Sequence, residues 1–175
     1  MRVVGIKILK NKLPEFVRIA ASGETVLVTD RTAQRVDGRT RSRPQRSVIY
    51  LDTSVAIAAL LAEERRPARE FWDRPMASSR LLTYELWTAI HARALTRTHG
   101  EAAHALTDAL TLLELDDEVL SRAFEPFPVP LRTLDALHLA SMEYLRQLGI
   151  TVELASYDSR LIAAARGMGF EIVEL

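Results

Sequence analysis

Four acidic residues in separate parts of the chain have the type and position that a metal-dependent site requires. Asp52 and Asp158 each follow a short apolar run, while Glu85 and Asp135 each lie near the start of a segment with helical periodicity. In a parallel sheet such junctions can converge on one edge. Carboxylates that crowd within a few ångströms repel one another, so they stay ionised together only around cations. If the four acids meet, we expect them to hold a cation.

The ligand type restricts the choice of cation. Sites built only from carboxylate oxygens suit Mg²⁺ or Mn²⁺, whereas zinc favours His or Cys. One or two such ions can orient a phosphodiester, lower the pKa of a bound water and neutralise the leaving oxygen. The alternative is that each acid only caps a helix, because acids are favoured in first helical turns. Position alone leaves the two interpretations about even.

The segment that ends at Asp52 shows how the acids would be positioned. Residues 48–51 form an apolar run of strand-forming types, which is typical of a strand buried on both faces. Thr53 and Ser54 follow Asp52, and residues 55–61 are compatible with a helix. In open parallel sheets ligands bind just outside the carboxyl ends of the strands. Asp52 therefore stands where such a sheet would place its site.

The rest of the body alternates apolar runs with helical patterns, which predicts an α/β fold with a parallel sheet and helices on both faces. After the first strand we predict strands at 79–83, 151–156 and 170–175. Helices are predicted in six places: after Leu61 through Trp72, from Tyr84 to Leu95, and at 101–113, 117–125, 134–148 and 159–167. Three prolines between 126 and 130 mark a loop.

Composition places the protein among ordinary globular chains. Its 175 residues are 48% hydrophobic and 26% charged, enough for one domain or a domain with a small appendage. There is no cysteine, which excludes disulfides and thiolate metal sites. No apolar stretch approaches the roughly 18 residues of a membrane span, and early lysines argue against a secretory signal. We expect a cytoplasmic protein with no membrane partner.

The net charge of zero conceals an asymmetry. Residues 1–46 contain eleven Lys and Arg against four acids, a net charge of +7, so residues 47–175 carry −7. A basic end joined to an acidic body suggests that the basic part meets nucleic acid or another anionic surface. The alternative is a tail that only increases solubility.

Within the basic end, residues 1–36 are predicted to form a small β-α-β head, and residues 37–46 a linker. Strands are expected at 3–6 and 25–29, on either side of an amphipathic helix that Gly23 ends. The linker is polar, without apolar periodicity. Its arginines either clamp phosphates or keep the joint solvated; they are Arg39, Arg41, Arg43 and Arg46.

Four stretches of the body together resemble PIN-domain nucleases, specifically the VapC-type toxins. They are Tyr50-Leu-Asp-Thr-Ser54, Thr83-Tyr84-Glu85-Leu86, Leu134-Asp-Ala-Leu-His-Leu-Ala140 and residues 156–169. The resemblance covers residues 47–175. It implies a PIN-like three-layer α/β/α sandwich in which Asp52, Glu85, Asp135 and Asp158 bind metal and catalyse, while Thr53 or Ser54 supports the site through a hydroxyl. It also implies an RNA substrate, commonly tRNA or ribosomal RNA.

The N-terminal segment is similar to the head of Phd/YefM-type antitoxins. The similarity lies in Val4-Gly-Ile-Lys and the pattern that follows it, and then in Ser22-Gly-Glu-Thr-Val-Leu-Val-Thr-Asp-Arg31. Such heads form dimers and bind operator DNA. Two departures are Pro14, where the family continues its helix, and the different sequence after Arg31, where the family continues into a toxin-wrapping tail. The resemblance therefore implies a truncated head at residues 1–36.

Three further residues have two interpretations each. His138 lies one turn after Asp135 and is interpreted as core packing in preference to a general base or a group behind the metal ligands, because Leu and Ala surround it. Arg132 and Arg160 flank Asp135 and Asp158, and each either contacts phosphate or is simply solvated.

Together these features predict a Mg²⁺- or Mn²⁺-dependent endoribonuclease, the toxin of a type II toxin–antitoxin system, fused to a partial antitoxin-like segment. The expected partners are RNA, a cognate antitoxin, a second copy of the chain in a homodimer, and operator DNA through residues 1–36. The competing hypothesis is a DNA-binding toxin–antitoxin regulator whose PIN body serves only as a dimerisation or partner-binding platform.

Overall fold

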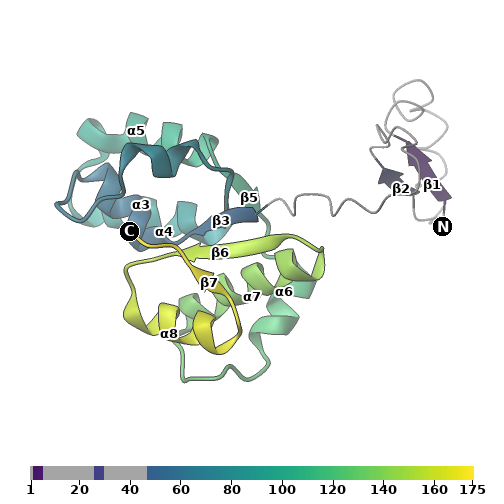
Figure 1. The fold of residues 1–175 in the computed structure, drawn as a ribbon. Coiled ribbons are helices and arrows are strands. Elements are labelled where there is room, and N and C mark those ends of the chain that lie inside the picture. The colour runs from purple at the N-terminus through teal and green to yellow at the C-terminus, as the bar shows by residue number, and fades with distance from the viewer. Residues whose placement is uncertain (1, 6–25, 30–46) are drawn as a thin grey trace. The chain divides into compact units, whose positions relative to one another are not determined.

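The computed structural model describes residues 2–5, 26–29 and 47–175 (Figure 1). The chain divides into two compact units, Met1–Ser42 and Arg43–Leu175. In the first unit, β1 (Arg2–Gly5) pairs in parallel with β2 (Val26–Thr29). The bounds of the two strands agree to within one residue with the strands predicted at 3–6 and 25–29. The helix predicted between them and the linker at 37–46 lie outside the described residues.

The second unit is built on a five-stranded sheet in which every neighbouring pair is parallel (Figure 1). The strand order is β5-β4-β3-β6-β7. The strands are β3 (Ser47–Leu51), β4 (Met76–Ser79), β5 (Thr111–Leu113), β6 (Thr151–Ala155) and β7 (Glu171–Ile172). The first strand of the body, β3, is therefore the central one, with β4 on one side and β6 on the other. This confirms the prediction of a parallel sheet.

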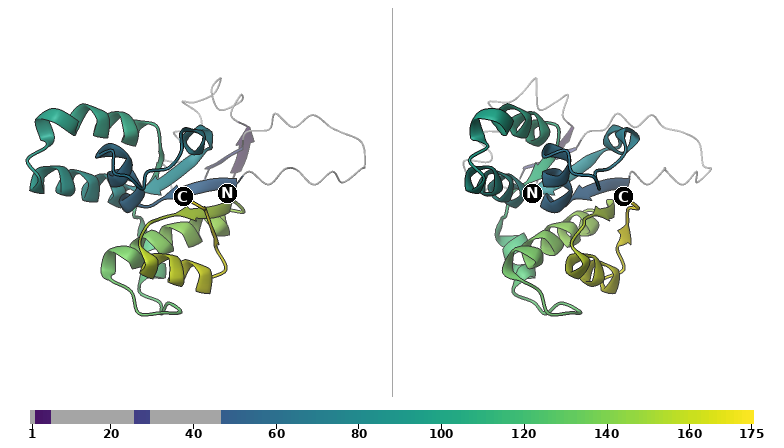
Figure 2. Two further views of the ribbon diagram at one scale, coloured as in Figure 1. Left: turned by 60° about the vertical axis from the view of Figure 1, so that its left-hand side comes forward. Right: turned by 90° about the vertical axis from the view of Figure 1, so that its left-hand side faces the viewer.

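Helices cover both faces of the sheet, which gives three layers (Figure 2). One face carries α3 (Thr53–Leu60), α4 (Arg80–Ala92) and α5 (Thr96–Asp108). The other carries α7 (Thr133–Gln147) and α8 (Ser159–Gly167), with α6 (Asp117–Ala123) packed against α7. A short 3₁₀ helix, η1 (Arg69–Asp73), precedes β4.

The central strand is buried on both faces, as its apolar run predicted. Side chains alternate along a strand, so Ile49 and Leu51 enter the cluster under α3 and α4, whereas Tyr50 enters the cluster under α7 and α8. All three side chains are fully buried. The strand ends at Leu51, and Asp52 follows it directly at the carboxyl edge of the sheet.

The prediction of a strand at 79–83 is wrong. The strand is β4 at Met76–Ser79, and α4 already begins at Arg80. β4 reads Met-Ala-Ser-Ser and has none of the β-branched or aromatic residues that usually mark a strand. Leu81 and Leu82, which suggested a strand, are buried in the first turn of α4. Glu85 therefore lies one turn further into its helix than the sequence indicated.

Other element boundaries also differ from the prediction. The helix predicted at 101–113 is α5 at Thr96–Asp108, and its last predicted residues form the edge strand β5. No long helix follows α3 in the described part: Ala62 has a positive φ of 53°, and only η1 forms before β4. The final strand is β7 alone rather than 170–175. Among the described residues, none of the helices is both long and apolar enough to cross a bilayer.

Candidate active site

Asp52, Glu85, Asp135 and Asp158 all line one open cleft of about 730 Å³. They come from four elements: the end of β3, helix α4, the first turn of α7, and the residue before α8. Thr53, Ser54 and Arg132 also line this cleft, whereas Arg160 does not. The linker residues Arg39, Arg41 and Arg43 lie outside the described residues.

Asp52 is held by three donors at the junction of β3 and α3. Its Oδ2 accepts hydrogen bonds from the Ser54 backbone N at 3.3 Å, from the Ser54 hydroxyl, and from Ser156 Oγ at 2.8 Å. The first of these makes Asp52 the N-cap of α3. Ser156 directly follows β6, so this contact links the carboxyl ends of two neighbouring strands at the site.

Asp158 has a similar position at the start of α8. Its Oδ1 accepts from the backbone N of Arg160 at 2.7 Å and of Leu161 at 3.1 Å, which caps the helix. Capping and lining the cleft thus coincide in Asp52 and Asp158, although the sequence presented them as alternatives. In both residues the backbone cap uses one carboxylate oxygen, so the cap itself does not exclude the other oxygen from binding a ligand.

Glu85 is held by side chains from two other helices. Its Oε2 accepts from Thr53 Oγ1 at 2.6 Å and lies 2.9 Å from His138 Nε2. Burial alone raises the pKa of Glu85, but the hydrogen bonds from His138 and Thr53 and the charge of His138 outweigh burial and hold the pKa below its ordinary value. Glu85 is therefore held in its ionised form.

His138 is more than a core residue, so the sequence-based interpretation was incomplete. The side chain is 1% exposed, and its two ring nitrogens face Glu85 and the Tyr50 hydroxyl, the latter at 3.0 Å. Nε2 also lies 3.9 Å from Asp52 Oδ1. Burial opposes a charge on His138, but Tyr50, the Glu85 hydrogen bond and the charge of Asp52 outweigh burial and raise the pKa to about 10.

Sequence reasoning treated Tyr50 only as a strand residue and missed its contact with His138. One signal was available. A tyrosine in a strand that is buried on both faces needs a hydrogen-bond partner for its hydroxyl, and histidine is one of the few side chains that can supply it.

Asp135 provides a test of whether the cleft fits a cation. Its Oδ2 is buried and has no hydrogen-bond partner among the described residues. Burial, and then the charges of Asp158 and Asp52, raise the pKa of Asp135 above its ordinary value. A buried carboxylate oxygen without a partner is costly, and a hard cation in the cleft would supply the partner that Oδ2 lacks.

The four acids line a cleft but do not form a closed cage. Within the part of the chain that the structure describes, no three Asp, Glu or His side chains converge closely enough to hold an ion as they stand. The chemistry of the donor set nevertheless fits Mg²⁺ or Mn²⁺, because every candidate ligand is a carboxylate oxygen.

The sequence pattern of the PIN domain family matches residues 49–167, so the chain belongs to the PIN-domain family. Among curated proteins, Ribonuclease VapC46 of Mycobacterium tuberculosis is 33% identical over 132 residues, which span 73% of this chain and 97% of that protein. Ribonuclease VapC47 of the same species is 31% identical over 130 residues, or 70% and 93% of the two chains. Within the PIN family the chain therefore falls in the VapC group.

A solved structure supports the fold. It is that of Mycobacterium tuberculosis VapC20, described as a sarcin-ricin loop cleaving toxin. The two structures superpose with a TM-score of 0.53 at 23% identity. The match covers 66% of this chain and 94% of the VapC20 chain. The PIN and VapC resemblance of the body is thus confirmed. The family match begins at residue 49 and leaves the antitoxin-like head outside it.

Proposed function

We propose that this protein is a metal-dependent endoribonuclease, the toxin of a type II toxin–antitoxin system. The observation that carries the proposal is the meeting of four carboxylates from four elements in one cleft. No arginine of residues 47–175 forms an ion pair with any of them. The names of the curated VapC relatives support ribonuclease activity in preference to a purely structural role for the PIN body.

The chain's own residues have distinct parts in this proposal. Asp52, Glu85, Asp135 and Asp158 would hold Mg²⁺ or Mn²⁺, which polarises a phosphodiester and provides a nucleophile at neutral pH. Ser54 orients Asp52, and Thr53 orients Glu85, through the hydrogen bonds described above.

Arg132 borders the same cleft, directly before α7. Its guanidinium is suited to bind the phosphate that the acids would otherwise repel. Arg160 lies at the start of α8 beside Asp158 and is a weaker candidate, because it does not line the cleft.

The proposed substrate is a structured RNA of the tRNA or ribosomal class. The test is to incubate the purified protein with such RNAs in Mg²⁺, with EDTA as one control and Asp135→Ala as the other. We expect discrete cleavage products with wild type and Mg²⁺ only. Expression in cells, followed by growth and total RNA integrity, extends the same comparison. Cleavage that persists in EDTA, or in Asp135→Ala, would contradict the proposed mechanism.

The proposed partners are a cognate antitoxin, a second copy of the chain, and operator DNA bound through residues 1–36. The antitoxin-like head, like the cytoplasmic location, remains a prediction from sequence. Ten linker residues reach at most roughly 35 Å when fully extended, and they must also lead into β3. We therefore propose that the head does not inhibit its own chain's site through a tail, and that Arg39, Arg41 and Arg43 attract nucleic acid.

This second proposal is tested by comparing the full chain with a shortened protein that begins at Ser47. If the arginines bind phosphate, the shortened protein binds RNA more weakly and with a shallower salt dependence. If it instead cleaves RNA much faster at equal folding and metal, the head is an inhibitor and the proposal is wrong.

A further inference from the structure

A buried chain of hydrogen bonds connects three elements behind the cleft. The hydroxyl oxygen of Tyr50 on β3 lies 3.0 Å from Nδ1 of His138 on α7. The other ring nitrogen of His138, Nε2, lies 2.9 Å from Oε2 of Glu85 on α4. Tyr50 is fully buried and His138 nearly so. Their rings meet edge to face, with centroids 5.8 Å apart and an interplanar angle of 79°. The contact therefore fixes the plane of the imidazole as well as its polar ends.

Glu85 needs such support more than the neighbouring aspartates do. Asp52 and Asp158 are oriented by backbone amides at helix N-termini. Glu85 lies inside α4, where the backbone N–H groups bond to the helix itself, and its side chain has one more rotatable bond. Both of its donors in the described residues come from other helices: Thr53 and His138.

These two donors share one oxygen of the carboxylate. Thr53 Oγ1 and His138 Nε2 both contact Oε2, and together they set the torsion of the Glu85 carboxylate. Oε1 then remains as the oxygen for a ligand in the cleft.

Tyr50 selects which ring nitrogen faces Glu85. Its hydroxyl can donate to a neutral Nδ1 or accept from a protonated one, so the contact holds in both protonation states of the ring. A flipped imidazole would place carbon atoms against both the Tyr50 hydroxyl and Glu85 Oε2, which would leave two buried polar groups without partners. The tyrosine thus makes one ring orientation strongly preferred.

We propose that His138 and Tyr50 are positioning residues that hold the Glu85 carboxylate in the orientation required to bind the catalytic cation. This inference rests on the proposed metal-dependent function. It adds that the affinity of the site for the cation depends on the hydrogen-bonded side chains behind the cleft as well as on the four acids. Groups behind metal ligands typically change metal affinity or activity by about 10–100-fold when they are removed.

The decisive measurement is Mn²⁺ affinity, followed by electron paramagnetic resonance. We expect His138→Leu to weaken Mn²⁺ binding by about 10-fold or more. His138→Gln retains an N–H donor toward Glu85 and should recover part of this loss. Tyr50→Phe keeps the ring and removes only the hydroxyl, so it should fold and weaken Mn²⁺ binding by a smaller factor. In all three variants kcat at low Mn²⁺ should fall, while the KM for RNA stays close to wild type.

A second measurement does not depend on metal or activity. The ring ¹⁵N signals of His138, observed by nuclear magnetic resonance in EDTA, should move in both Tyr50→Phe and Glu85→Gln, since each variant removes or weakens one hydrogen bond of the ring. The matched control is Thr107→Val, which removes a buried hydroxyl that bonds only within α5. This control should lower stability without changing the His138 signals or Mn²⁺ affinity.

The outcomes separate this inference from the proposed function. Wild-type Mn²⁺ affinity in folded Tyr50→Phe and His138→Gln, together with unchanged His138 signals in Tyr50→Phe, overturns the positioning role and leaves the ribonuclease proposal standing. Wild-type protein that neither binds Mn²⁺ nor cleaves RNA overturns the proposed function, and the inference with it. Weaker Mn²⁺ binding in Tyr50→Phe but not in Thr107→Val supports the inference.

Discussion

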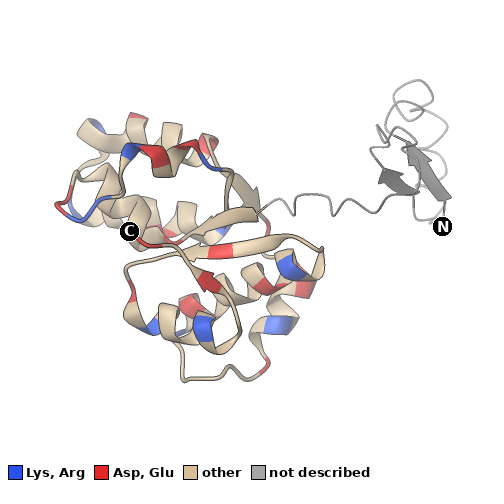
Figure 3. Ribbon diagram, in the orientation of Figure 1, with Lys and Arg blue, Asp and Glu red and all other residues tan. Residues whose placement is uncertain are grey.

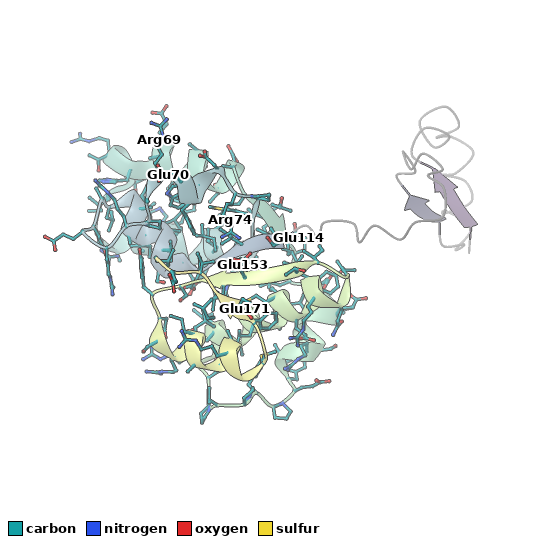
Figure 4. The ribbon with its side chains drawn as sticks, in the orientation of Figure 1. Arg69, Glu70, Arg74, Glu114, Glu153 and Glu171 are labelled. Carbon is teal, nitrogen blue, oxygen red and sulfur yellow. The ribbon has the colours of Figure 1, made fainter. Side chains whose placement is uncertain are left out.

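The acids of the cleft and several acids elsewhere in the body have different kinds of partner. Some acids outside the cleft are paired with arginines. Arg74 Nη2 lies 2.5 Å from Glu153 Oε1 across the sheet (Figure 4), and Arg80 Nε lies 2.9 Å from Glu114 Oε1. Figure 3 shows the acidic positions on the neighbouring strands β6 and β7, where Glu153 and Glu171 are in register. The partners of the cleft acids are hydroxyls, backbone amides and one imidazole.

This difference bears on which acids are available to bind a cation. An arginine neutralises a carboxylate within the chain and leaves it little affinity for an outside cation. Hydroxyls and amides orient Asp52 and Asp158 but do not neutralise their charge. Glu85 differs, because charged His138 lies 2.9 Å from its Oε2. Glu153 in β6 and Ser156 just after it lie only three positions apart. Glu153 is paired with an arginine, whereas Ser156 donates a hydrogen bond to Asp52, which has no arginine partner.

The largest difference between a cleft acid and an arginine-paired acid is expected at Asp52. We expect Asp52→Asn to reduce Mg²⁺-dependent RNA cleavage by about 1,000-fold or more, because the loss of a metal ligand removes several kcal/mol of transition-state stabilisation. Asn is also a good N-cap, so circular dichroism should show an intact fold. The matched control is Glu153→Gln, which should cleave at the wild-type rate. Equal loss in both variants would mean that the cleft acids are not special.

Metal binding should change stability only through the cleft. At Mn²⁺ concentrations of 100 times Kd, mass action stabilises the folded state by about 2.7 kcal/mol, which corresponds to a rise in Tm of roughly 5–10 °C for a domain of this size. A variant with all four acids changed to their amides should show no rise. Thermal unfolding of wild type and of the variant, each with and without Mn²⁺, measures the two changes in Tm. An equal rise in Tm in the two proteins would indicate that Mn²⁺ binds outside the cleft.

Asp135 should behave in the opposite way to a paired acid when metal is absent. Its buried oxygen has no partner, and it faces the charges of Asp158 and Asp52. In EDTA we therefore expect Asp135→Asn to raise Tm by roughly 1–3 °C, while the same substitution abolishes the rise in Tm with Mn²⁺. A lower Tm in EDTA would show that Asp135 makes a stabilising contact in the metal-free protein.

The paired acids should give the smallest effect. The side chains of Arg74 and Glu153 are 38% and 23% exposed, and partly exposed pairs contribute less than about 1 kcal/mol. Glu153→Gln should lower the free energy of unfolding by no more than this, and the loss should shrink in high salt because salt screens the pair. Urea unfolding at two salt concentrations measures it. Any change in Mn²⁺ affinity would contradict the separation of the two groups.

Sequence alone could predict the sheet edge and the acids that line it. The apolar run 48–51 and the run 151–156 have strong strand signals, and each ends at or near an acid, so the parallel topology followed. β4 could not be located because Met-Ala-Ser-Ser carries no strand signal, although all four residues are buried. Its small side chains fit between two helical layers, and that depends on packing that only the fold reveals.

The hydrogen bonds behind the cleft could not be predicted from local sequence patterns either. Tyr50 and His138 are separated by 88 positions, and His138 and Glu85 by 53. Tyr50 and His138, each viewed alone, are compatible with ordinary core packing, and only the crossing of β3, α4 and α7 shows the chain of hydrogen bonds. Which oxygen of each acid remains without a partner likewise follows from three-dimensional contacts.

The position of β3 in the sheet has a consequence for the timing of activity during synthesis. β3 is the first strand of the body to leave the ribosome, but its neighbour β6 is made after β4 and β5, and the Ser156 hydroxyl that holds Asp52 lies 104 positions later in the chain. Such distant pairings form slowly. A nascent chain that has reached only α6 carries Asp52 and Glu85 but neither Asp135 nor Asp158. The proposed nuclease is therefore expected to stay inactive until the segment that carries Asp135 and Asp158 has been made.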